Sequence, residues 1–208
     1  MHIFAHFSLF CAQIGGIMGK NIAIFASGNG TNAENIIRYF QGNGEVRVKL
    51  VLSNRRSAFV LERAARLGVP SACLTKEEWA EGEAVLALMK EAEIDFIVLA
   101  GFLARVPDCL LQAYPDKIVN IHPSLLPKFG GKGMYGEHVH EAVLAAGEQE
   151  SGITIQYINE RYDEGAIICQ QKCPVLPDDT PDTLAARVHA LEYEYYPRVV
   201  EQLVLGQR

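Results

Sequence analysis

The stretch NIAIFASGNGTNAENII, residues 21–37, passes from a strand pattern through a glycine-rich turn into a helical pattern. Residues 21–26 are mostly apolar and include Ile22, Ile24 and Phe25, which favour strands; Gly28 and Gly30 follow, and apolar residues then return at the spacing of a helix. A strand that leads through a tight turn into a helix is the first half of a βαβ unit, whose helix packs back onto a parallel sheet. This stretch therefore predicts an α/β fold.

The same alternation of strand and helix continues along the chain. Strand patterns recur at residues 46–52, 71–74, 96–100 and 118–121, and helical patterns lie at residues 32–40, 58–67, 77–91 and 107–113. Helices of this length between strands form right-handed crossovers that cover both faces of a parallel sheet. We expect a Rossmann-like, doubly wound, mostly parallel sheet of about seven strands with helices on both faces.

The last third of the chain has a different pattern. Residues 152–159 and 166–174 alternate apolar and polar side chains, which indicates strands that extend the same sheet as a mixed edge. The final helix should begin with Thr180 as N-cap and Pro181 in its first turn, and Pro197 should kink or interrupt it. Its predicted buried stripe consists of Leu184, Val188, Leu191, Tyr195, Val199 and Leu203.

Composition excludes several classes of protein. The chain has 208 residues, of which 49% are hydrophobic, and a formal net charge of -6, which indicates one well-buried domain rather than a duplex nucleic-acid binder. No segment after the N-terminus approaches the roughly 20 apolar residues of a membrane span. The five cysteines include no CxxC pair, which favours a reducing cytoplasm over a disulfide framework or a zinc site.

Residues 1–17 form an N-terminal extension in this interpretation, and residues 18–208 form a single domain. The extension contains no Lys or Arg, and His6 and Gln13 interrupt its apolar run, so it does not match a secretory signal peptide. Met18 directly precedes GKNIAIFASG, which contains the first strand pattern, and is a candidate native start. The extension is therefore predicted to be disordered or non-native.

The turn after the first strand is a candidate anion site. Gly28, Gly30 and Ala33 form a G-x-G-x-x-A pattern at the start of a helix, where free backbone N–H groups and the helix dipole attract negative charge. Thr31 and Asn32 add a hydroxyl and an amide. A single phosphate on a small substrate is the ligand that we favour.

Two alternatives for this turn remain open. No acidic residue ends the second strand to bind a dinucleotide ribose, but Arg55 and Arg56 there suit the extra phosphate of NADP in an oxidoreductase. A glycine turn without a ligand, or a non-catalytic ligand sensor, fits the same residues.

Polar residues converge at the end of the fifth predicted strand. Asn120 and His122 lie two residues apart, so strand alternation places both side chains on one face, at the edge where doubly wound sheets bind ligands. An amide donor beside a protonatable histidine suits the stabilisation of an oxyanion. Asp163, in the turn ERYDEG, is the candidate partner that would orient His122 and favour its charged form. A structural His122 and a turn-capping Asp163 fit the same pattern.

The other histidines and the serines give no further catalytic motif. His138 and His140 should diverge on the helix predicted from GEHVHEAVL, so no zinc site is expected. No strong nucleophile motif is present. We therefore expect direct transfer between two bound substrates.

Four separated segments resemble the phosphoribosylglycinamide formyltransferase family. They are SGNGTN at residues 27–32, VLAGFLARVP at 98–107, NIHPSLLPKF at 120–129 and YDEGAIICQ at 162–170. The resemblance extends from Met18 to the C-terminus, although NIHPSLLP alone is shared across the wider formyltransferase family. It implies the formyltransferase fold and transfer of a formyl group from 10-formyltetrahydrofolate to the amine of 5'-phosphoribosylglycinamide, in purine biosynthesis.

The resemblance also implies roles for single residues. Asn120 and protonated His122 would stabilise the tetrahedral oxyanion, and Asp163 would help to relay the amine proton. The family's acceptor-binding residues correspond to Gly30, Thr31, Asn32, His189 and Glu192, of which the first three would hold the phosphate. Its folate-binding residues correspond to Leu103, Ala104, Arg105 and Val106, together with Asn120.

The expected co-substrate is thus 10-formyltetrahydrofolate, with no metal and no nicotinamide. The expected partners are small molecules, with no nucleic acid and no membrane, and the protein is expected to be a cytoplasmic monomer or homodimer. Related formyltransferases that act on methionyl-tRNA, hydrolyse formyltetrahydrofolate or modify sugar amines are longer, so this chain of 208 residues matches them less well.

The sequence departs from the family pattern in two places that concern the folate tail. A Met-Arg type step is common where this chain has Leu103-Ala104-Arg105, and a basic residue is often found near Gly82. Residues 129–135 are expected to form a flexible flap, with Lys128 and Lys132 near anionic substrates.

Overall fold

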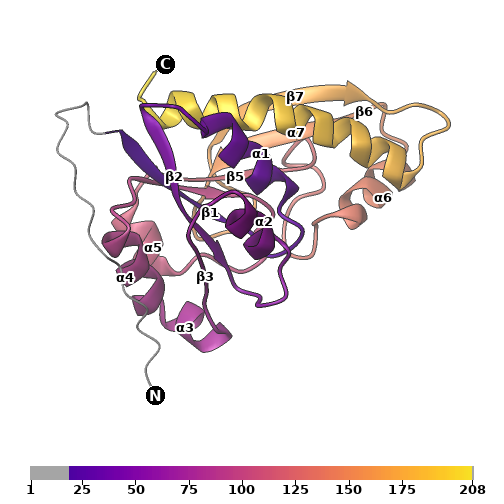
Figure 1. Ribbon diagram of the computed structural model, residues 1–208. Helices are drawn as coiled ribbons and strands as arrows, with labels where there is room; N and C mark the ends of the chain where they lie inside the picture. Colours follow the sequence, from indigo (N-terminus) through magenta and orange to yellow (C-terminus); the bar gives the residue numbers. More distant parts are fainter. Residues whose placement is uncertain (1–18, 208) are drawn as a thin grey trace.

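The computed structural model describes residues 19–207 and contains a seven-stranded sheet in the order β3-β2-β1-β4-β5-β6-β7 (Figure 1). The strands are β1 (Lys20–Phe25), β2 (Val46–Ser53), β3 (Ser71–Cys73), β4 (Phe96–Leu99), β5 (Ile118–His122), β6 (Glu150–Tyr157) and β7 (Ile167–Pro174). Neighbours among the first five strands are parallel, whereas β6 is antiparallel to β5 and β7. The predicted doubly wound, mostly parallel α/β sheet is confirmed. Our predictions for residues 1–17 lie outside the described residues.

Helices cover both faces of this sheet. They are α1 (Thr31–Phe40), α2 (Val60–Arg66), α3 (Lys76–Glu81), α4 (Glu83–Glu91), α5 (Asp108–Ala113), α6 (Glu137–Ala145) and α7 (Pro181–Val204). Figure 1 shows α7 (yellow) beside α1, with α4 and α5 (magenta) away from it. Successive residues of β1 enter different cores: Ile24 packs with the helices α1, α2 and α7, whereas Phe25 packs with Trp79 of α3.

The helix predicted over residues 77–91 is two helices. Gly82 separates them with φ 77°, and it caps the C-terminus of α3 and the N-terminus of α4. A left-handed residue cannot continue a right-handed helix, so the chain turns there. Thr75 and Glu78 form a capping box that begins α3, which moves its start one residue ahead of the prediction.

The C-terminal helix runs without interruption through Pro197, so the predicted interruption is wrong. Pro197 has no N–H to donate to the Tyr193 carbonyl, but Asn35 Nδ2 of α1 donates to that oxygen at 3.0 Å. The helix therefore loses an internal hydrogen bond and gains one to a neighbouring helix.

The predicted buried stripe of α7 is correct only in its first part. Leu184 and Val188 are fully buried, but Leu191, Tyr195, Val199 and Leu203 are only partly buried. The row of buried residues continues in steps of four through Glu192, Tyr196, Val200 and Val204. The prediction followed apolar residues only, and it therefore left this row at position 192, where the chain has a glutamate.

The order of the strands places three chain segments at one edge of the sheet. β1 and β4 are neighbours although they are not consecutive, which creates the crevice at the carboxyl ends of the strands where such folds bind ligands. Ser27, just after β1, donates its N–H to the Gly101 carbonyl just after β4 at 3.0 Å. The end of β5, with His122, lies on the other side of β4.

Candidate active site

β5 carries two of the predicted site residues on one face. Asn120 pairs with Gln156 of β6 and His122 pairs with Thr154, in an antiparallel register. Residues opposite each other in such a ladder share a face, so the four side chains project to the same side of the sheet. His122 is 4% exposed, which removes most solvent from the ring.

The imidazole of His122 is held from two sides. Its Nε2 lies 2.8 Å from the Phe129 carbonyl, and since that oxygen only accepts, Nε2 carries a proton. Its Nδ1 lies 3.7 Å from Asp163 Oδ2. Nδ1 is therefore the ring nitrogen that no backbone group engages. It faces the Asp163 carboxylate at a distance too long for a direct hydrogen bond.

Asp163 reaches His122 because the turn between β6 and β7 folds back over the sheet. Its backbone has φ 57°, a left-handed conformation that Asp tolerates better than most residues. Gly131 N–H donates to its Oδ2 at 2.8 Å, and Gln156 Nε2 donates to its Oδ1 at 3.1 Å. A Cβ at Gly130 would lie 3.2 Å from the Asp163 Cβ, so the chain after Phe129 packs tightly against this side chain.

The turn after His122 is tied to the last two strands. Thr154 Oγ1 donates to the Ser124 carbonyl at 2.7 Å and accepts from the Leu126 N–H at 3.0 Å. Gln170 Nε2 of β7 donates to the Leu126 carbonyl at 2.9 Å. The segment HPSLLP is thus held rigidly by β6 and β7, which fixes the direction of the strand end that carries Asn120 and His122.

The glycine turn after β1 has the geometry of an anion site. Gly30 caps α1 with φ 77°, and a Cβ there would lie 2.5 Å from the Val60 Cβ, so both the backbone and the space require glycine. Glu34 N–H donates to the Gly30 carbonyl at 2.9 Å, whereas the N–H groups of Thr31 and Asn32 have no acceptor among the described residues. These free donors point out of the first turn of α1.

A buried carboxylate from the C-terminal helix completes this turn. Glu192 is 4% exposed, and its Oε2 accepts from Asn32 Nδ2 at 2.8 Å and lies 2.7 Å from His189 Nδ1. The hydrogen bond to Glu192 raises the pKa of His189 above its ordinary value, although burial opposes this effect. Asn32 Oδ1 is buried without a partner among the described residues. The structure therefore brings Gly30, Thr31, Asn32, His189 and Glu192 together, as one cluster beside the catalytic candidates.

The sequence profile of formyl transferases matches residues 20–200. The chain belongs to the formyl transferase family. A relative named phosphoribosylglycinamide formyltransferase from Bacillus subtilis is 37% identical over 190 residues, which cover 89% of this chain and 95% of the relative.

A plant relative and two solved structures agree with this family membership. The chloroplastic phosphoribosylglycinamide formyltransferase of Arabidopsis thaliana is 40% identical over 187 residues, which cover 87% of this chain but only 64% of the relative. The chain thus spans slightly less than two thirds of that longer protein. Two crystal structures share the fold. Glycinamide ribonucleotide transformylase 1 from Symbiobacterium toebii is 34% identical with a TM-score of 0.83, and the match covers 90% of this chain and 89% of that one. Phosphoribosylglycinamide formyltransferase from Bacillus halodurans is 38% identical with a TM-score of 0.80, and the match covers 91% of this chain and 97% of that one.

This formyl transferase contains a buried histidine that the sequence interpretation set aside. His138 is exposed and His140 is 2% exposed, so the two diverge on α6 as predicted. Burial lowers the pKa of His140, and the charge of His189 acts in the same direction. Its Nδ1 has no partner among the described residues. The spacing of His140 and Val143 on the inward face of α6 was the signal available in the sequence.

The segment proposed for folate in this formyl transferase is held on both sides. Leu103 N–H donates to Ser27 Oγ at 2.9 Å, and Trp79 Nε1 donates to the Arg105 carbonyl at 2.7 Å. Val106 is buried, and Ala104 is half-buried. The Arg105 guanidinium forms an ion pair with Asp108 at 2.6 Å, so the side chain points along the surface. The Leu103 N–H and the Arg105 carbonyl are thus engaged within the protein, and the other backbone groups of the segment are available to a ligand.

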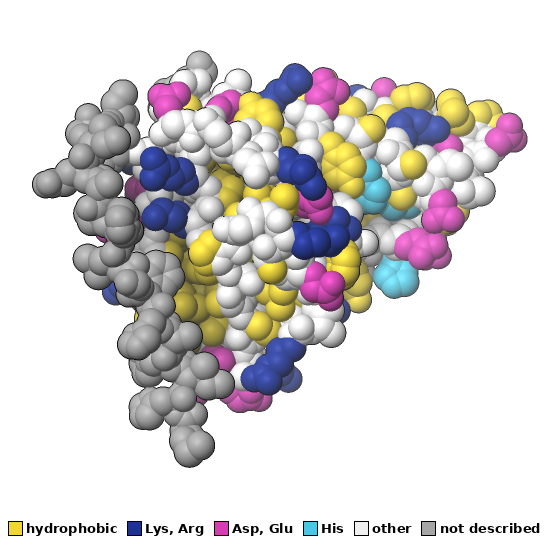
Figure 2. Space-filling view, viewed as in Figure 1, with side chains coloured by type: hydrophobic (Ala, Val, Ile, Leu, Met, Phe, Trp, Pro, Cys, Tyr) yellow, Lys and Arg dark blue, Asp and Glu magenta, His cyan; other side chains and the backbone are white. Residues whose placement is uncertain are grey.

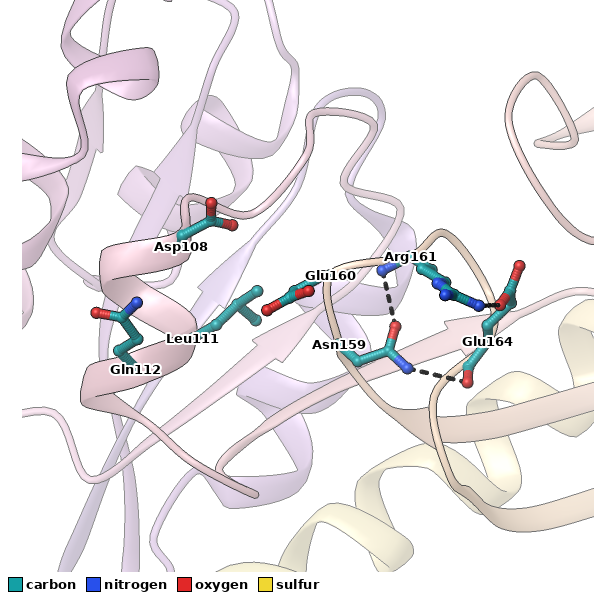
Figure 3. Close-up of a pocket in the computed structure, with 7 residues that line it drawn as sticks. All are labelled: Asp108, Leu111, Gln112, Asn159, Glu160, Arg161 and Glu164. Atoms are coloured by element: carbon teal, nitrogen blue, oxygen red, sulfur yellow. Dashed lines mark hydrogen bonds and ion pairs between the residues drawn. The ribbon is translucent and has the colours of Figure 1, made fainter.

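A pocket of about 420 Å³ lies between α5 and the turn that leads to Asp163 (Figure 3). It is lined by Asp108, Leu111, Gln112, Asn159, Glu160, Arg161 and Glu164. Asn159 accepts from the Arg161 N–H at 2.8 Å and donates to the Glu164 carbonyl at 3.0 Å, which shapes the turn. Figure 3 shows Leu111 and Glu160 pointing toward each other across the opening.

A second pocket, of about 470 Å³, lies on the other side of the glycine turn. Arg55, Phe59 and Arg63 line it together with Gly28 and Asn29. The guanidinium of Arg63 is engaged by Asn29 and Glu34. Figure 2 shows Lys and Arg side chains over α1 and α2, and histidines beside α6 and α7. Among residues 19–207 no group of His, Cys, Asp and Glu has the arrangement of a metal site, and no helix is long and apolar enough to cross a membrane.

Proposed function

We propose that this protein transfers the formyl group of 10-formyltetrahydrofolate to the amine of 5'-phosphoribosylglycinamide, which yields formylglycinamide ribonucleotide and tetrahydrofolate in purine biosynthesis. The observation that carries the proposal is the pair formed by His122 Nδ1 and Asp163 Oδ2, 3.7 Å apart, next to Asn120. Family membership and the names of the relatives support the same reaction.

The reaction requires a proton to move from the attacking amine to N10 of the folate. The neutral amine attacks the formyl carbon, and the carbonyl oxygen becomes a tetrahedral oxyanion. The Asn120 amide and the Nδ1–H of protonated His122 donate to this oxyanion, since Nε2 is engaged by the Phe129 carbonyl. Asp163 takes the amine proton, directly or through one water, and the proton reaches N10 as the bond between N10 and the formyl carbon breaks.

The acceptor binds with its phosphate at the first turn of α1. The free N–H groups of Thr31 and Asn32 and the positive end of the helix dipole attract the phosphate. His189 adds positive charge, because Glu192 raises its pKa. Glu192 itself is an acceptor and repels a phosphate, so we assign it to the ribose hydroxyls or to the glycinamide nitrogen.

The folate binds between residues 103–106 and the turn that carries Asp163. We assign the pterin to the pocket of about 420 Å³ beside α5, where Leu111 offers an apolar surface and the Glu160 carboxylate offers acceptors for the ring N–H groups. Ala104 adds no polar side chain and Arg105 is paired with Asp108, so we assign recognition of the ligand to the backbone groups of this segment that Ser27 and Trp79 do not engage.

We place the enzyme in the cytoplasm as a monomer or homodimer that acts on small molecules only. The odd number of cysteines and the lack of a CxxC pair in the sequence support a reducing compartment. The Arabidopsis thaliana relative is chloroplastic by name, which makes fractionation of the native host the direct measurement.

The decisive experiment measures formyl transfer with 10-formyltetrahydrofolate and 5'-phosphoribosylglycinamide. The His122→Ala and Asp163→Asn variants should lose about 10²- to 10⁴-fold in kcat. His138→Ala, an exposed histidine on α6, is the matched control and should keep the activity of the parent. Full turnover in both site variants would remove the assigned roles, and binding without transfer by the parent protein would indicate a ligand sensor. A change in nicotinamide absorbance with NADP would support the oxidoreductase alternative.

A further inference from the structure

Gln156 lies at the centre of the site although its sequence context gives no catalytic signal. It is the register partner of Asn120 across β5 and β6, so both side chains occupy the same face of the sheet. It is 0% exposed. A fully buried amide of this length must find partners inside the protein.

One end of the Gln156 amide holds the Asp163 carboxylate. Nε2 donates to Oδ1 at 3.1 Å, and because a carboxylate only accepts, the amide cannot be turned the other way. Gly131 N–H donates to Oδ2 at 2.8 Å. The two donors, on opposite oxygens, fix the plane of the carboxylate and leave Oδ2 facing His122 Nδ1 at 3.7 Å.

The other end of the amide has no partner among residues 19–207. Oε1 is buried without a donor among the described residues. A glutamine retained for stability would have both ends paired, because an unpaired buried acceptor opposes folding. An apolar side chain of similar volume would fill this space without that penalty, so the amide has a purpose other than stability.

We propose that Gln156 is a positioning residue of the transfer reaction, which acts by holding the Asp163 carboxylate against His122. The proposal rests on the proposed function, because it assigns Gln156 to the same proton relay. Gln156 does not touch the reacting atoms in this role. Gln156 instead fixes the orientation of the Asp163 carboxylate, so that Oδ2 faces His122.

Three substitutions separate this role from a structural one. Gln156→Met keeps the volume and removes the amide, and it should lower kcat by about 10- to 100-fold with KM values changed less than about threefold. Gln156→His keeps an N–H donor and should retain most of the activity. Gln156→Glu replaces the donor by a carboxylate that repels Asp163, and it should be at least as impaired as Gln156→Met.

A double-variant cycle shows whether the effect passes through Asp163. In an Asp163→Asn background, Gln156→Met should cause no further loss of kcat, whereas independent roles would make the two losses multiply. The melting temperature of Gln156→Met should stay within a few degrees of the parent value. A large loss of melting temperature with unchanged kcat of the folded protein, or multiplicative losses in the cycle, would overturn the proposal.

A crystal structure of Gln156→Met provides a readout that does not depend on the substrates. The Asp163 side chain should turn away from His122, so that the Oδ2 to Nδ1 distance exceeds 3.7 Å. An unmoved carboxylate would refute the positioning role even if the enzyme is active. Absence of transfer in the parent protein, with a displaced carboxylate in the variant, would instead refute the proposed substrates and leave the positioning role standing.

Discussion

Asn32 Nδ2 donates to Glu192 Oε2 at 2.8 Å, which joins the first turn of α1 to α7 across 160 residues of sequence. His189 lies 2.7 Å from the same oxygen. Two donors thus compensate the cost of burying the Glu192 carboxylate, which is 4% exposed. This relationship explains how a glutamate enters the buried row of a long helix, and it links the candidate phosphate site to the packing of the core.

Substitution of Glu192 should weaken acceptor binding and alter the titration of His189. In Glu192→Gln the pKa of His189 should fall toward its ordinary value of 6.5, because the hydrogen bond to Glu192 is the main cause of its raised pKa. KM for the acceptor should rise about tenfold or more, as expected from the loss of a charge-assisted hydrogen bond. NMR titration of the histidines and steady-state kinetics measure both effects. Glu194→Gln, on the exposed side of α7, is the control, and an unchanged His189 titration in Glu192→Gln would contradict the assigned pair.

Gly30 should tolerate no side chain. Gly30→Ala forces an alanine to φ 77° with its Cβ 2.5 Å from the Val60 Cβ, so the free energy of unfolding should fall by about 1–3 kcal/mol. Displacement of the turn should also raise KM for the phosphate-bearing acceptor. Chemical denaturation and kinetics test the variant. Gly28→Ala is the control for stability, because a Cβ there meets nothing within 4 Å. Equal stability of the two variants would refute the argument.

His140 should make the protein less stable in mild acid. Burial lowers the pKa of His140 below its ordinary value of 6.5, so the folded state binds fewer protons at this residue than the unfolded state. Its contribution to the free energy of unfolding is therefore complete above about pH 6.5 and declines as the pH falls toward the lowered pKa. His189 and His122 strengthen this effect, and Glu192 opposes it.

The measurement is urea denaturation between pH 5 and 8. His140→Asn should flatten the decline in stability on the acid side, whereas His138→Asn, which changes an exposed residue, should leave the slope unchanged. His189, whose pKa is raised, contributes in the opposite sense, since its stabilisation is complete at low pH and is lost as the pH rises through the raised pKa. Identical slopes in His140→Asn and the parent would contradict the prediction.

Tyr196 should stabilise the sheet through its hydroxyl. The side chain is 0% exposed, and its hydroxyl donates to the Leu99 carbonyl at 2.8 Å, with the Val119 carbonyl at 3.3 Å. Burial raises the pKa of Tyr196 well above its ordinary range, so the phenol stays neutral. Tyr196→Phe should lower the free energy of unfolding by about 1–2 kcal/mol in denaturant titrations. Tyr193→Phe, on the exposed side of α7, is the comparison, and equal losses in both would argue against the hydrogen bond.

Local patterns predicted the elements well and their ends less well. The alternation of residues 118–121 placed Asn120 and His122 on one face, because side-chain direction in a strand depends only on neighbouring residues. The same reasoning wrongly predicted α3 and α4 as one helix, because periodicity alone did not reveal that Gly82 takes a left-handed conformation. The predicted buried stripe of α7 was wrong at Glu192, because the side chains that permit this glutamate to be buried are Asn32 of α1 and His189 of α7 itself.

The sequence by itself determined the order of strands and helices, the glycine turn and the resemblance to a formyltransferase family, because short-range periodicity and motif spacing carry that information. Only the tertiary structure decided that Asp163 meets His122, that Gln156 holds Asp163 and that Glu192 is buried against Asn32. These contacts depend on the register of β6 against β5 and on the docking of α7, which result from packing between distant segments. No local pattern in the chain encodes them.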